Sequence, residues 1–75
     1  MNEDPSLKIL GARIRRARKR LGLSQEQLAL ESDLDRSYMG GVERGERNLS
    51  FLKLCAIARV LKKDLPSLTR ELPVS

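Results

Sequence analysis

The chain lacks histidine and has little cysteine, two residue types on which much enzyme and metal chemistry depends. It has no histidine and a single cysteine, Cys55, among 75 residues. The sequence shows no metal-ligand cluster, no phosphate-binding loop and no nucleophile–base pair, so we expect neither an enzyme nor a metal or cofactor. It has no tryptophan, one tyrosine and one phenylalanine. Two rings are too few for a stacking platform that binds single-stranded nucleic acid.

Long apolar runs are also missing, so no segment is expected to span a membrane. The first residues, Met-Asn-Glu-Asp-Pro, lack the basic and apolar regions of a secretion signal. We therefore expect a cytoplasmic protein without a membrane partner. The length predicts one domain over residues 1–75, with a core of about 7–72. No site for a small-molecule effector is evident.

Positive charge is what the chain has in excess. It carries 15 Lys and Arg against 10 Asp and Glu, which gives a net charge of +5. Six cations fall between positions 13 and 20: Arg13, Arg15, Arg16, Arg18, Lys19 and Arg20. Such a run is often only a solvated helix face, but it also suits an electrostatic footprint for phosphate.

Apolar residues recur every three or four positions, without strand-like alternation, which predicts an all-α, compact five-helix domain. Capping residues and glycines set the expected helix ends. Asp4 or Ser6 caps the first helix, Gly22 follows it, and Asp33 occupies a left-handed turn after the second. The expected helices run roughly from Ser6 to Leu21, Ser24 to Ser32, Asp35 to Arg44, Ser50 to Lys63, and Asp64 to Leu72.

The second and third helices form a helix-turn-helix pattern. Apolar residues are spaced to hold the two helices at a fixed angle, namely Leu28, Ala29, Leu34, Met39 and Val42. This motif places its second helix in the DNA major groove. Groove-facing positions of that helix are the expected base contacts: Arg36, Ser37, Gly40 and Gly41. The fork of Arg36 fits guanine, with a phosphate contact as the close alternative.

Two adjacent glycines inside a helix are unusual, because each costs roughly 1 kcal/mol relative to alanine. Gly40 and Gly41 therefore indicate either close approach of the helix backbone to DNA or close packing against neighbouring helices. Polar residues around the motif are the expected phosphate contacts, with solvated surface groups as the alternative. They are Ser24, Gln25, Tyr38, Arg44, Arg47 and Asn48. For Tyr38 the alternatives are packing beside a thymine methyl or covering the edge of the motif. Gln25 begins a helix, where free N–H groups attract phosphate.

From Leu10 to Leu72 the chain resembles the phage repressor and Cro type of helix-turn-helix domain. The resemblance lies in Gly22-Leu-Ser-Gln-Glu-Gln-Leu-Ala29, Tyr38-Met-Gly-Gly-Val-Glu-Arg-Gly45 and Ile57-Ala-Arg-Val-Leu61. The runs Leu34–Tyr38 and Val42–Gly45 are similar to controller proteins of restriction-modification systems, although many small regulators share them. The family resemblance implies an ion pair between Arg18 and Glu43; the alternative is a solvated Arg18.

One short helix reads few base pairs, whereas a two-fold dimer reads two half-sites about 34–36 Å apart. Surplus apolar residues are the candidate dimer interface: Phe51, Leu65, Leu68 and Leu72. We therefore expect a homodimeric, sequence-specific transcriptional regulator that binds a palindromic site in double-stranded DNA. The alternative is an antitoxin or protein-interaction module that neutralises a partner protein and binds DNA secondarily. Only three residues follow Leu72, which disfavours a partner-binding tail.

Overall fold

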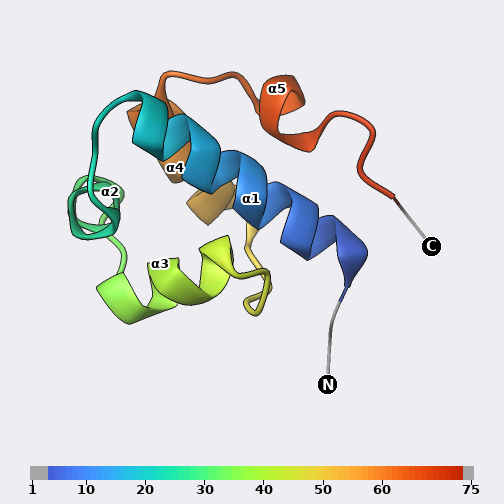
Figure 1. Cartoon of the computed structure of the whole chain (residues 1–75), viewed down its shortest axis with the longest axis horizontal. Helices are drawn as coiled ribbons and strands as arrows, with labels where there is room; N and C mark the ends of the chain where they lie inside the picture. The colour runs from blue at the N-terminus through green and yellow to red at the C-terminus, as the bar shows by residue number, and fades with distance from the viewer. Residues whose placement is uncertain (1–3, 74–75) are drawn as a thin grey trace.

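Across residues 4–73 the fold consists of five α-helices, as the sequence predicts. The structure is a computed structural model that describes residues 4–73. The helices are α1 (Pro5–Arg20), α2 (Gln25–Glu31), α3 (Arg36–Glu43), α4 (Phe51–Leu61) and α5 (Leu65–Thr69). Figure 1 shows α1 through the middle of the molecule, with α3 along one side and α5 along the other. None of the described helices has the length and apolar character to cross a membrane.

Each helix begins at a polar side chain that accepts a hydrogen bond from a backbone N–H of the first turn. The N-caps are Asp4, Ser24, Asp35, Ser50 and Asp64. At α2 the capping box is complete, because Gln27 N donates to Ser24 Oγ and Ser24 N donates to Gln27 Oε1. These caps satisfy N–H groups that have no partner inside their helices, and so they fix where each helix starts.

Left-handed residues end the first three helices. Gly22 has φ of 73°, Asp33 has 59° and Gly45 has 78°. The residue after each one donates back into the helix, as in Leu34 N to Ala29 O at 2.8 Å. This is the Schellman arrangement, which satisfies carbonyls of the last turn. The turn between α2 and α3 is therefore closed by Asp33, as predicted.

Two expectations about helix ends are wrong. Helix α5 ends at Thr69 rather than near Leu72, because Arg70 leaves the helical region with ψ of 130° and Glu71 is left-handed. Leu21, expected to end the first helix, is instead the residue that caps α1 and is 45% exposed. It lies past the last helical residue, and the chain reverses at Gly22 immediately afterwards.

Every helix contributes to one core. Its buried apolar residues are Leu10, Ile14, Ala17, Leu28, Ala29, Met39, Val42, Ile57, Ala58, Leu61 and Leu68. Helices α1 and α3 meet closely at Gly11, where an added Cβ would lie 2.3 Å from the carbonyl oxygen of Val42. Only glycine fits there, since the obstructing atoms are backbone. This contact seats α3 directly on α1 and leaves the opposite side of α3 facing outward.

Candidate nucleic-acid interface

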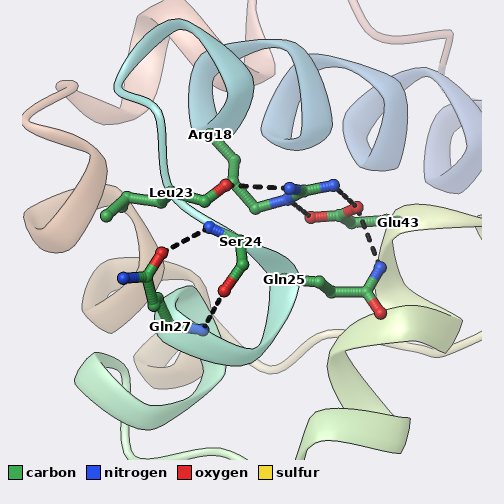
Figure 2. Close-up of polar contacts among 6 residues, drawn as sticks. All are labelled: Arg18, Leu23, Ser24, Gln25, Gln27 and Glu43. Atoms are coloured by element: carbon green, nitrogen blue, oxygen red, sulfur yellow. Dashed lines mark hydrogen bonds and ion pairs between the residues drawn. The ribbon is translucent and has the colours of Figure 1, made fainter.

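A buried ion pair holds the end of α3 to α1. Arg18 Nε lies 2.7 Å from Glu43 Oε2, and Arg18 Nη2 donates to Glu43 Oε1 at 3.0 Å. The side chains are only 9% and 2% exposed. Arg18 Nη1 also donates to the carbonyl of Leu23 at 2.9 Å, as Figure 2 shows. The guanidinium therefore joins α1, α3 and the turn that leads into α2.

Gln25 adds α2 to this cluster, which sequence reasoning did not anticipate. Its Nε2 donates to Glu43 Oε1 at 3.1 Å (Figure 2). Glu43 thus accepts hydrogen bonds from α1 and from α2, so three helices meet at one carboxylate. Gln25 remains at the start of α2, as predicted, but one of its two amide hydrogens is already bonded within the protein. The other is left for a ligand.

The first turn of α3 is open to solvent. Arg36 and Ser37 are exposed, and Arg36 makes no hydrogen bond or ion pair with any of residues 4–73. Ser37 donates its hydroxyl to the N-cap carboxylate of Asp35, leaving its oxygen as an acceptor. That bond, with the backbone N–H groups of Tyr38 and Ser37, lowers the pKa of Asp35 below its ordinary value. Of Arg36 and Ser37, only Arg36 therefore has side-chain N–H donors that are not bonded within residues 4–73.

Gly40 and Gly41 are buried beneath side chains rather than exposed. An added Cβ at Gly40 would lie 3.1 Å from Arg44 Nη1 and 3.2 Å from Gln25 Oε1. At Gly41 the same atom would lie 2.7 Å from Cγ of Arg47. The atoms nearest each added Cβ belong to the side chains of Gln25, Arg44 and Arg47 rather than to backbone, so these three side chains cover the two glycines. Direct backbone contact with DNA requires those side chains to move.

Tyr38 organises the loop after α3. Its hydroxyl donates to the carbonyl of Asn48 at 3.1 Å, and Lys53 Nζ lies 4.6 Å from the ring centroid. Arg47 Cζ lies 6.0 Å from the same centroid. The Tyr38 hydroxyl hydrogen is therefore committed inside the protein. Lys53, on α4, thus lies beside the same ring as Arg47, which was a predicted phosphate contact. Lys53 was not identified from the sequence, because its contact with Tyr38 spans 15 positions of the chain.

The arrangement matches a known family. A helix-turn-helix family model matches residues 14–68. The chain belongs to the helix-turn-helix family. Among curated relatives, Control protein C.SmaI of Serratia marcescens is 45% identical over 60 residues, covering 80% of this chain and 71% of its own. Control protein C.BamHI of Bacillus amyloliquefaciens is 38% identical over 65 residues, covering 81% and 80%.

Solved structures of controller proteins are also similar to this chain. The restriction-modification controller protein C.AhdI from Aeromonas hydrophila is 48% identical with a TM-score of 0.80, covering 83% of this chain and 94% of that one. C.Esp1396I bound to a 25 base pair operator site is 34% identical with a TM-score of 0.77, covering 89% and 88%. The resemblance inferred from the sequence is confirmed. These relatives are controller proteins rather than enzymes, as expected for this chain.

The leucines expected at the dimer interface differ in how much of their surface is exposed to a second copy. Leu68 is 2% exposed and belongs to the core, so it has almost no surface for a second copy. Its side chain closes the protein's own interior, which the helical spacing alone did not distinguish from an outward position. Leu65 and Leu72 are half-buried against the core. Phe51 and Leu52, by contrast, are 65% and 77% exposed at the start of α4.

Proposed function

We propose that the protein is a transcriptional regulator that binds specific sites in double-stranded DNA as a homodimer. The observation that carries this proposal is the uncommitted Arg36 in the first turn of α3. It projects from a helix that Gly11 and the Arg18–Glu43 pair hold rigidly. The operator complex of C.Esp1396I supports double-stranded DNA as the partner. Because DNA is the proposed partner, the cytoplasm is the proposed location.

Sequence would be read at the N-terminal end of α3. Arg36 presents a planar fork that matches the O6 and N7 acceptors of guanine in the major groove. Ser37 offers an acceptor oxygen beside it, suited to a base amino group. Gly40 and Gly41 take part only by leaving room, since Gln25, Arg44 and Arg47 lie over them.

DNA phosphates would be bound by polar residues around α3. Gln25 and Ser24 lie at the start of α2, while Arg44, Arg47 and Asn48 lie at and beyond the end of α3. Such contacts fix the position of a protein on the duplex without reading sequence. Tyr38 would act mainly by holding Asn48 through its hydroxyl and by cation–π contact with Lys53 and Arg47, so it would position this phosphate-binding loop.

The second copy would dock on the exposed apolar start of α4. Phe51 and Leu52 project there, and the half-buried Leu65 and Leu72 would supply the edge of the interface. An interface of this kind is two-fold symmetric, so each copy presents the same patch and each α3 reads one half-site.

Selection of bound sequences from random duplex DNA tests the proposal. The expected result is one enriched sequence with two inverted half-sites centred about one helical turn, or a small multiple of it, apart. Enrichment of a single half-site would contradict the symmetric dimer. Recovery of unselected sequence at physiological ionic strength would contradict sequence-specific recognition.

A further inference from the structure

A cationic groove lies between α1 and α5. It is an open groove of about 370 Å³ and is lined by five cations, Arg13, Arg16, Arg20, Lys63 and Arg70, together with the hydroxyl-bearing Ser67. Among residues 4–73, no carboxylate lines it. Two other cavities of similar size do include carboxylates, Glu43 in one and Asp4 and Glu46 in the other. This groove therefore gathers positive charge without the compensation found elsewhere on the protein.

The groove faces away from the surface proposed to bind DNA. Gly11 packs against α3, and Arg20 lies nine positions further along α1, which is two and a half turns of a helix with 3.6 residues per turn. Arg20 therefore points to the opposite side. Arg13 lies on that side too, since its Nη1 donates to the carbonyl of Leu68 in α5 at 3.0 Å. In Figure 1, α3 and α5 flank α1 from opposite sides. A duplex held by α3 does not reach these cations.

The groove contains as many cations as the chain has in excess. The net charge is +5, so the Lys and Arg outside the groove are matched in number by Asp and Glu. Gathering like charges raises the free energy of the folded state by self-repulsion. An anion seated in the groove would relieve that repulsion. Three of the six cations in the α1 run, which was expected to serve DNA, thus line another face.

We propose that this groove binds a compact polyphosphate, either inorganic or the phosphate chain of a nucleotide. Four of its five cations are arginines, whose forked guanidinium groups bind phosphate through paired hydrogen bonds. The cavity lies within the range of about 300–1,000 Å³ that small-ligand sites occupy. Its cationic lining suits the charged part of such a ligand rather than an apolar body. The sequence indicated no such site because Lys63 and Arg70 join the α1 row only in the fold.

Isothermal titration of the full chain with inorganic triphosphate, without DNA and at physiological ionic strength, tests this proposal. We expect saturable binding that Arg20→Gln/Arg70→Gln weakens about tenfold or more, as expected when two charge-assisted contacts are lost. The matched control is Arg15→Gln/Lys19→Gln, which removes the same charge from exposed positions outside the groove. It should change affinity less than about twofold. Thermal unfolding checks that each variant folds, and Arg16→Gln/Lys63→Gln provides a second groove variant.

Titrations with other ligands distinguish a nucleotide from inorganic polyphosphate as the bound anion. A nucleoside triphosphate that binds more tightly than triphosphate, with the same loss in the groove variant, assigns the site to nucleotides. Equal affinity assigns it to inorganic polyphosphate, and both results support the proposal. Three results would overturn it: no binding by the native protein, equal weakening in groove and control variants, or tighter binding of an acidic peptide, which would indicate a protein partner. Because DNA is absent, these outcomes are independent of the proposed operator binding.

Discussion

Gln25 donates from Nε2 to Oε1 of Glu43 at 3.1 Å, so the first residue of α2 is bonded to the last residue of α3. The same carboxylate receives two hydrogen bonds from Arg18 of α1. Glu43 therefore joins α1, α2 and α3 and fixes the position of α3. The angle between α2 and α3 depends on this carboxylate as well as on apolar packing.

Replacement of Glu43 tests that role. Glu43→Gln removes the charge opposite Arg18, whose side chain is only 9% exposed. An uncompensated buried cation should lower the free energy of unfolding by about 3–5 kcal/mol. The matched control is Glu46→Gln, since Glu46 pairs with Arg44 at 3.0 Å but is 59% exposed. That control should cost less than about 1 kcal/mol in urea unfolding. Equal costs for the two variants would count against a structural role for Glu43.

The glycines should respond to alanine in opposite ways. Gly11→Ala places a Cβ 2.3 Å from the Val42 carbonyl oxygen, which is backbone. Helices α1 and α3 must then separate, at a cost of about 2 kcal/mol or more. Gly40→Ala meets only the ends of Arg44 and Gln25, both at more than 3 Å. Gain of helix propensity should make it neutral or stabilising by up to about 1 kcal/mol. Thermal unfolding measures both, and a stable Gly11→Ala protein would contradict the tight α1–α3 contact.

Acid should weaken the cap of α3. The pKa of Asp35 is lowered by the hydroxyl of Ser37, then by the backbone N–H groups of Tyr38 and Ser37. A carboxylate with a lowered folded-state pKa stabilises the fold above its unfolded pKa, and the effect is lost as pH falls through the folded pKa. Asp4, which is held similarly by Ser6, adds to this trend.

Asp35→Asn isolates the contribution of Asp35, since asparagine caps a helix but does not titrate. We expect the native protein to be more stable than the variant at neutral pH. The difference in melting temperature should shrink as the pH falls into the acidic range. A difference that stays constant with pH would show that the Asp35 charge does not stabilise α3.

Phe51→Glu should weaken self-association, because it puts a charge in the proposed interface between copies. Phe51 is 65% exposed, so the variant is expected to fold normally. Sedimentation should show a dimer for the native protein and a shift toward monomer for the variant. Leu30→Glu is the control, since Leu30 is 78% exposed on α2. A native protein that remains monomeric, or equal effects of both variants, would contradict this interface.

Local signals were enough to predict most of the fold. Each helix start carries its capping residue in the sequence, and Gly22, Asp33 and Gly45 marked three reversals of the chain. Their effect is decided within a few residues, so spacing along the chain reveals it. The end of α5 was missed by three residues, because the helix ends where the backbone of Arg70 becomes extended.

Contacts between distant positions were harder to predict. The spacing of Leu68 placed it on an apolar stripe, but which side of that stripe faces the core depends on how α5 docks against α1. Likewise, the sequence does not reveal that Arg47 covers Gly41 or that Gln25 reaches Glu43. These relationships arise from the packing angle of the helices, so they emerge only in three dimensions.

Binding of Arg36→Ala to a set of single-base operator variants tests the central claim most directly. Arg36 is exposed and uncommitted at the start of α3, so we predict a loss of about 1–3 kcal/mol on the preferred site and relaxed preference at one base position in each half-site. Arg47→Ala, which removes a proposed phosphate contact, should weaken all sites about equally. If Arg36→Ala instead lowers every affinity by the same factor and leaves all base preferences intact, α3 does not read sequence through Arg36.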